Sequence, residues 1–170
     1  MPLIKLNATQ ALTGALPAVS GANLTGISST GLIRQIQKIV GTGILSATNL
    51  ESTSFVSTNL TKSITPNSSS NKILIYYQWE HKFNASSEGY GTAIHRSISG
   101  GSSGNISDSE QNQYNYLTAS SSELRHVPSL LYVDEPNTTS AITYTLYVKG
   151  HTTSRVEINP QHMILFEITG

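Results

Sequence analysis

Histidine is the first residue type to consider for chemistry in this chain, because its imidazole binds metals and transfers protons near neutral pH. Five histidines are present: His81, His95, His126, His151 and His162. No two of them are two or four residues apart, and no HExxH motif occurs, so a zinc site would need ligands from distant strands. His95 and His126 lie in strand-like segments and could each supply one ligand per chain at a threefold axis. We expect hydrogen-bonded or surface roles instead, and predict no metal site.

Two carboxylate pairs, Asp108 with Glu110 and Asp134 with Glu135, are the candidates for glycoside hydrolysis. That reaction needs two carboxyl groups about 5–9.5 Å apart across a sugar. Neighbouring residues of a strand point to opposite faces, which places Asp134 and Glu135 badly. Asp108 and Glu110 lie in a polar loop, where no burial would raise a carboxyl pKa. We expect turn-forming, solvated carboxylates at all four positions.

The remaining motifs do not indicate catalysis either. The glycines of the segment GGSSGN follow a strand-like run but precede no helix, so they cannot form a phosphate cradle at a helix terminus. Seven Asn-x-Ser/Thr sites occur. Because a third of the chain is Ser, Thr or Asn, many such matches arise by composition, and without a signal peptide we treat them as incidental. We therefore predict no enzymatic activity, no catalytic residues and no cofactor.

Aromatic side chains could stack on sugar rings if they are exposed. The alternative is packing in the core or at an interface, which large aromatic side chains commonly serve, and we favour it for Tyr77 and Trp79. Tyr114 and Tyr116 lie beside the polar loop 99–113 and are the residues that we expect to contact a surface glycan. The aromatic candidates are Tyr76, Tyr77, Trp79, Tyr90, Tyr114 and Tyr116.

Length and composition predict a single domain with an appendage. The chain has 170 residues, of which 12% are charged, with ten basic and ten acidic side chains that cancel. A zero net charge offers no electrostatic attraction to nucleic acid, an anionic membrane or an acidic ligand. Solubility must come from Ser, Thr and Asn, which make up roughly a third of the chain. No cysteine, signal-peptide pattern or 18-residue apolar stretch is present, so we expect no disulfide, no secretion signal and no membrane insertion.

Residues 1–31 differ from the rest, and we predict that they form an extended N-terminal arm. They are rich in small residues and carry one charge, at Lys5. A flexible leader is the alternative, but a linker does not need the apolar residues spaced along this segment. We expect these residues to contact an assembly partner: Leu3, Leu6, Leu12, Leu16, Leu24 and Ile27.

From residue 32 onward the sequence predicts an all-β domain, 32–170. Short apolar or alternating runs are separated by clusters of Gly, Pro, Asn and Ser, which is typical of successive antiparallel strands. The first run has a spacing that also fits a short helix. Eight or nine strands with no convincing helix indicate an antiparallel β-sandwich or jelly roll. Eight runs show this pattern: 31–41, 53–57, 60–65, 72–80, 90–98, 129–133, 142–149 and 162–168. The segments 114–118 and 123–127 are candidates for additional short strands.

The segment 72–79 is the strongest strand prediction, and its apolar residues occupy both faces. A strand of this kind is buried on both sides, in a sandwich or at a subunit interface. We predict a stable homotrimer with this strand or 162–168 near the threefold axis. The interface candidates are Ile73, Ile75, Tyr77 and Trp79.

Several motifs carry a family resemblance. The segments SLLYVDEPNTTSAITYTLYVKG, EIN and ILFEITG, which span 129–170, resemble the closing module of short virion proteins of tailed bacteriophages. SFVSTNLTKSITPNSSSNKILIYYQWEH, at 54–81, is similar to the strand, turn and strand of that family. AIHRSISG is similar to another strand, although His95 and Arg96 replace its usual small residues. ALTGALPAVSGANLTGI resembles the connector that precedes the module.

The resemblance implies a virion structural protein with a trimeric jelly-roll body and a location on the outer surface of the particle. Two roles fit it: a capsid decoration or cement protein anchored by its arm, and a short tail or head fibre that contacts the host. The implied partners are major capsid or tail proteins and a host surface glycan. A lectin-like carbohydrate-binding domain is the alternative from another class.

Overall fold

Ten strands form the part of the chain that the computed structural model describes, which is residues 32–40, 52–83, 88–107, 115–117, 124–150 and 157–170. All of these residues belong to one unit, 31–170. The strands are β1 (Ile33–Val40), β2 (Val56–Ile64), β3 (Lys72–Phe83), β4 (Glu88–Ile98), β5 (Ser103–Asn105), β6 (Asn115–Leu117), β7 (Leu124–His126), β8 (Ser129–Asp134), β9 (Ile142–Gly150) and β10 (Glu157–Ile168).

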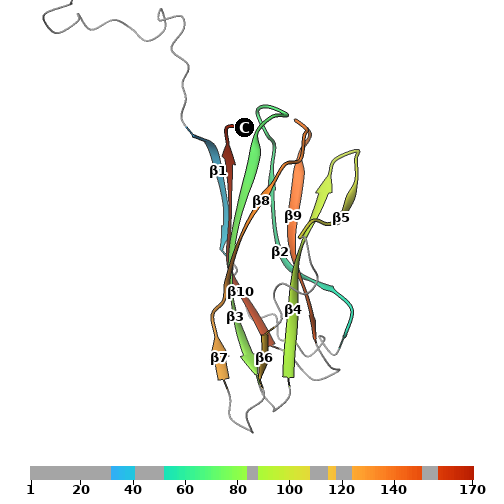
Figure 1. Ribbon diagram of the computed structural model, residues 1–170, viewed down its shortest axis with the longest axis vertical. Helices are drawn as coiled ribbons and strands as arrows, with labels where there is room; N and C mark the ends of the chain where they lie inside the picture. Colours follow the sequence, from blue (N-terminus) through green and yellow to red (C-terminus); the bar gives the residue numbers. More distant parts are fainter. Residues whose placement is uncertain (1–31, 41–51, 84–87, 108–114, 118–123, 151–156) are drawn as a thin grey trace, which may run out of the picture. The chain divides into compact units, whose positions relative to one another are not determined.

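The strands form two sheets that face each other, as Figure 1 shows edge-on. Sheet A has the order β1-β10-β3, and β3 then pairs with both β7 and β8. Sheet B has the order β2-β9-β4, and β4 then pairs with both β5 and β6. Counting β5 with β6 as one interrupted strand, and β7 with β8 as another, leaves eight strands. When these eight are numbered anew along the chain, sheet A has the order 1-8-3-6 and sheet B the order 2-7-4-5. This antiparallel arrangement is a jelly roll, and the predicted fold class is confirmed.

The core lies between the sheets because every second residue of the long strands points inward. In β3 these residues are Ile73, Ile75, Tyr77 and Trp79, and all four are 0% exposed. Sheet B supplies residues of β4 and β9 to the same cluster. The ring of Trp79 lies 5.1 Å from that of Tyr77 and meets Tyr90 of β4 edge-on at 6.5 Å. Aromatic packing therefore joins the two sheets, and the packing role predicted for Tyr77 and Trp79 is confirmed.

Local predictions are confirmed in most places and corrected in two. The first run, 31–41, is confirmed as a strand over Ile33–Val40, which pairs along β10, so the alternative of a short helix is wrong. The runs 53–57 and 60–65 contribute to a single strand, β2, with a register shift between Ser57 and Thr61. The polar loop is interrupted by β5, which pairs back onto β4 after a turn in which Gly100 has a φ of +71°. A positive φ at this point explains why glycine stands there.

Two connections between the sheets share a sequence pattern and a burial pattern. Pro66-Asn67 follows β2 and Pro136-Asn137 follows β8, and each is followed by a run of hydroxyl residues. Both prolines are buried, whereas both asparagines are exposed. Asn137 has a φ of +53°, a conformation that asparagine tolerates better than most residues. These turns hold the ends of the two sheets together.

Candidate functional site

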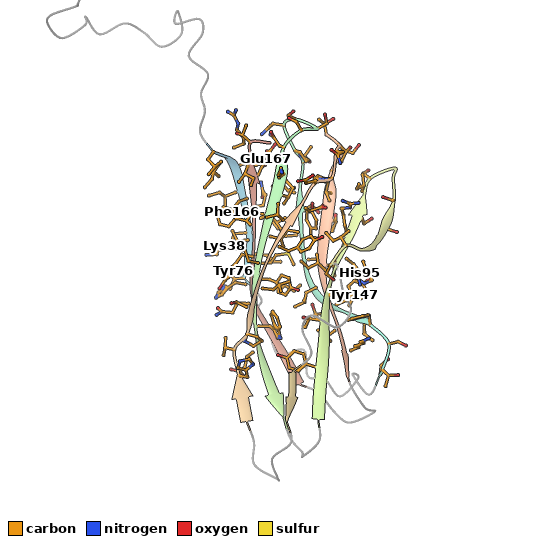
Figure 2. All side chains as sticks on the ribbon, viewed as in Figure 1. Lys38, Tyr76, His95, Tyr147, Phe166 and Glu167 are labelled. Carbon is orange, nitrogen blue, oxygen red and sulfur yellow. The ribbon has the colours of Figure 1, made fainter. Side chains whose placement is uncertain are left out.

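The outer surface of sheet A carries two cross-strand rows of mostly apolar side chains. The strand register places Ile36, Phe166, Leu74 and Val133 side by side in one row. The next row is Lys38, Ile164, Tyr76 and Leu131. Figure 2 shows Phe166, Lys38 and Tyr76 on the side of sheet A that lies away from sheet B. We call these eight residues, together with Val40 at the end of β1, the apolar face.

The apolar face is open to solvent in the single chain. Leu131 is 63% exposed, Ile36 54%, and Val133 and Val40 46% each. An antiparallel sheet with one solvated surface normally shows polar residues there. The largest contiguous apolar patch of a typical monomer covers about 300–600 Å² and is often an interaction site. The apolar face is therefore the first candidate functional surface of this protein.

The outer surface of sheet B has the opposite character, and we call it the polar face. Hydroxyl groups pair across its strands, with 3.0 Å between the Oγ1 atoms of Thr61 and Thr145 and 2.8 Å between Ser63 Oγ and Thr143 Oγ1. Such cross-strand hydroxyl pairs stabilise neighbouring strands without apolar contact. The polar face can therefore remain solvated.

A shallow hollow of about 170 Å³ lies on the polar face, and its lining includes His95, Ser103 and Thr143. The ring of His95 stacks on that of Tyr147 with 3.7 Å between centroids and 14° between planes. Figure 2 shows both residues on the side of sheet B that lies away from sheet A. The ring centroids of Phe55 and His95 are 6.3 Å apart, and Lys149 Nζ lies over the Phe55 ring, 4.7 Å from its centroid. The hollow thus combines hydroxyl groups with stacked rings.

Asp134 forms a buried polar cluster that joins the two sheets. Its carboxylate, on β8, accepts hydrogen bonds from Arg96 Nη1 of β4 at 2.8 and 3.1 Å and from Tyr144 Oη of β9 at 2.7 Å. Burial and the hydrogen bond to the Asp134 carboxylate raise the pKa of Tyr144. The expectation of a solvated carboxylate is wrong for Asp134, which is 6% exposed. It fits Glu135, whose side chain is 62% exposed and pairs with Lys72.

Glu167 is a second buried carboxylate, at 0% exposure, and the sequence analysis did not single it out. It accepts hydrogen bonds from Asn71 Nδ2 and the Asn67 backbone N–H at 2.6 Å each, from Gln35 Nε2 at 2.7 Å and from Asn67 Nδ2 at 2.9 Å. Burial alone would raise the pKa of Glu167, but these hydrogen bonds outweigh it and hold the pKa below its usual value. The alternation Met163, Leu165, Glu167 was the available signal, because it assigns Glu167 to an inward position.

Neither buried carboxylate is placed for catalysis, because each is enclosed by the groups that stabilise its charge. The segment Gly100-Gly101-Ser102-Ser103-Gly104 has the spacing of a hydrolase nucleophile elbow, Gly-x-Ser-x-Gly. It lies in the β4–β5 hairpin rather than in a strand-to-helix turn, so it lacks the geometry that exposes such a serine.

Within the described residues, no three His, Cys, Asp or Glu side chains are grouped to hold a metal. That part of the chain also contains no helix able to span a membrane.

The histidines considered as metal ligands occupy different surroundings. His95 is stacked on Tyr147, whereas His126 lies exposed on β7. The backbone of His126 pairs with that of His81 across β3 and β7, a juxtaposition that the sequence spacing did not reveal. His162 is partly buried on β10, and His151 lies outside the described residues.

The other predicted site residues divide into three groups. The interface candidates Ile73, Ile75, Tyr77 and Trp79 lie in the core of a single chain, so the residues of β3 that a partner could touch are those of its outer side, including Leu74 and Tyr76. The backbone of Tyr116 pairs with Gly89, and Tyr114 lies outside the described residues. The paired carboxylates of the loop and the arm residues also lie outside the described residues. They are Asp108, Glu110, Leu3, Leu6, Leu12, Leu16, Leu24 and Ile27.

Two solved structures resemble this chain at low sequence identity. No protein-family model matches the chain, and no curated protein matches it. Among solved structures, it is similar to the structure of infectious bursal disease virus Gx strain, with a TM-score of 0.46 and 9% identity over 80% of this chain. It is also similar to that of the Gt strain, with a TM-score of 0.43 and 9% identity over 91% of this chain. The chain spans only 33% and 43% of the lengths of those two proteins.

Proposed function

We propose that this chain is a structural protein of a virus particle, and specifically a trimeric capsid decoration protein of a tailed bacteriophage. The observation that carries the proposal is the apolar face. The outer side of one sheet of this jelly roll carries nine clustered residues, eight of them apolar. Four of the apolar ones are 46–63% exposed and the central four are partly buried, as expected of a surface that packs against a partner. The motifs at 54–81 and 129–170 that resemble tailed-phage virion proteins support the same proposal.

The arm, residues 1–31, is the proposed anchor to the capsid, and the jelly-roll body is proposed to project from the outer surface. Immunogold labelling of purified virions with an antibody to this chain tests the location. Labels over the whole head support decoration, labels at the tail or on a head appendage support a fibre, and unlabelled virions contradict both. Deleting residues 1–31 should abolish incorporation while the body stays folded. Incorporation of the truncated chain at normal copy number would exclude the arm as anchor.

A second candidate function is carbohydrate binding, which the hollow on the polar face favours. Hydroxyl groups of Ser103 and Thr143 can exchange hydrogen bonds with a sugar, and the His95–Tyr147 stack borders them. Glycan-array binding of the full chain tests this candidate. Tyr147→Ala should remove binding while the control variant Glu135→Ala, at an exposed position outside both faces, keeps it. If Tyr114→Ala/Tyr116→Ala removes binding instead, the glycan contacts those two tyrosines.

The proposed role includes no catalysis and no required metal or cofactor. Incubating the purified chain with host polysaccharide and measuring reducing sugar provides the check. Release of reducing sugar above that of a heat-denatured sample would contradict the structural role and favour a depolymerase.

A further inference from the structure

We propose that copies of this chain associate through the apolar face, so that the surface left open in one copy is covered by another. The inference deepens the proposed function and rests on it for the setting in a particle. It assigns the interface to the outer side of sheet A, and its centre to Leu74, Tyr76, Ile164 and Phe166 of the two middle strands, β3 and β10.

The size of the apolar face fits the centre of a protein interface. Four strands about 4.8 Å apart and two rows about 7 Å apart give it a footprint of roughly 19 by 14 Å, or about 270 Å². A standard interface covers about 800 Å² on each partner and has an apolar centre with a polar rim. The next row along β10, β3 and β8 provides such a rim, because it contains His162, Gln78 and Ser129.

The side chains at the centre are of the kinds that dominate interface energetics. Phe166 and Tyr76 stand on adjacent strands in neighbouring rows, flanked by Ile164 and Leu74. Clustered aromatic side chains at the middle of an interface are typical of the residues whose truncation costs most affinity. The single charge on the face, Lys38, lies on the edge strand β1. Its aliphatic stem can therefore cover apolar neighbours while its ammonium reaches solvent.

The arm of the same chain is a poorer occupant than a second copy. An extended segment crosses a surface about 19 Å wide with about six residues. The apolar residues of the arm are three to eight positions apart along Leu3, Leu6, Leu12, Leu16, Leu24 and Ile27. Six consecutive residues of the arm therefore bring at most two of them to the face. Leu3 with Leu6, and Leu24 with Ile27, are three apart and point to opposite sides, so one pair, Leu12 with Leu16, has both side chains on the same side.

A second copy offers an apolar surface of the same area, and electrostatics do not oppose its approach. The formal net charge is zero, with ten basic and ten acidic residues. Proteins with a net charge near zero lack the repulsion that keeps like molecules apart. Self-association through the apolar face is therefore the arrangement that the composition and the structure both favour.

The first test compares the mass of the full chain in solution across about 1–100 µM by sedimentation equilibrium. The wild type should be an oligomer, and Ile36→Glu/Leu131→Glu should weaken association by at least about 100-fold, because it buries two carboxylates in the interface. Both positions are more than half exposed, so the variant should keep the circular dichroism spectrum of the wild type. Ser63→Glu/Ser97→Glu is the matched control on sheet B, where both residues are exposed, and it should associate like the wild type.

The second test uses the absence of cysteine from the sequence, which makes single-cysteine variants unambiguous. Leu131→Cys should give cross-linked oligomers with a short bismaleimide, whereas Ser63→Cys should not. A Leu12→Cys/Leu131→Cys chain that cross-links only within one molecule would place the arm on the face and overturn the proposal. A wild type that stays monomeric at 100 µM, or one whose association Ile36→Glu/Leu131→Glu leaves unchanged, would overturn it as well.

The two proposals fail separately in these experiments. A trimer that depends on the apolar face supports the inference and the trimeric state of the proposed function. A dimer that depends on it supports the inference but contradicts the trimer. Virions that label with the antibody while the isolated chain is monomeric would keep the structural role and remove the inference.

Discussion

Glu167→Gln is expected to destabilise the jelly roll more than any other single removal of a carboxylate charge. The glutamine has the same shape, but its amide nitrogen is a donor that must face the donors of Asn71, Asn67 or Gln35. A hydrogen bond to a charged group contributes about 1.5–3 kcal/mol. Losing the charge and about two such bonds should lower the free energy of unfolding by about 3–5 kcal/mol. At about 2–4 °C per kcal/mol for a domain of this size, Tm should fall by roughly 10 °C.

Urea unfolding followed by circular dichroism, at one protein concentration for all variants, is the assay, since association would otherwise shift the apparent stability. Glu135→Gln is the matched control. Its side chain is 62% exposed and pairs with Lys72, which is itself 41% exposed. An exposed pair of this kind contributes less than about 1 kcal/mol. A Glu167→Gln variant within about 1 kcal/mol of the wild type would refute the assignment of Glu167 as a charged clamp.

The same residue makes a prediction about acid. The folded pKa of Glu167 lies below the usual value of 4.5. Its stabilising contribution is therefore complete above about pH 4.5 and is lost as the pH falls through the lowered pKa. The free energy of unfolding should decline less steeply below pH 4.5 in Glu167→Gln than in the wild type. Equal slopes in the two proteins would contradict the hydrogen-bonded carboxylate.

Three further predictions concern the core. Asp134→Asn leaves Arg96 without its counter-charge and should lower the free energy of unfolding by about 3 kcal/mol, measured by urea unfolding. Asp134→Leu/Arg96→Met should recover part of that loss, and a double variant less stable than Asp134→Asn would contradict this account. Burial raises the pKa of Tyr77 and Tyr90 above 10.0, so the free energy of unfolding should fall as the pH rises above 10. Tyr77→Phe should make that decline shallower. An unchanged alkaline slope would show that ionisation of Tyr77 does not cause the decline. Ile75→Ala should cost about 3 kcal/mol in thermal or urea unfolding, and a cost below about 1 kcal/mol would argue against a tightly packed centre.

Strand positions and fold class could be predicted from the sequence because they depend on local patterns. Alternation of apolar residues at 142–149 and 162–168 marks a strand wherever its partner lies. Pro-Asn clusters after residues 65 and 135 end strands through their own dihedral preferences. Those two features led to an antiparallel sandwich and to nearly every strand that the structure contains. The alternation Met163, Leu165, Glu167 also holds the signal for an inward Glu167, which we did not draw from the sequence, but alternation does not reveal what satisfies a buried charge.

The partners of the buried charges were decided by the tertiary structure alone. Glu167 is satisfied by Asn67, which precedes it by 100 residues, and Asp134 by Arg96, 38 residues before it. No local rule connects positions so far apart, because strand order and register bring them together. The side of β3 that faces the core was also undecidable locally. Since Ile73 to Trp79 carries apolar residues on both faces, only the packing of sheet B could select the odd positions for the core, and so leave Leu74 and Tyr76 on the apolar face.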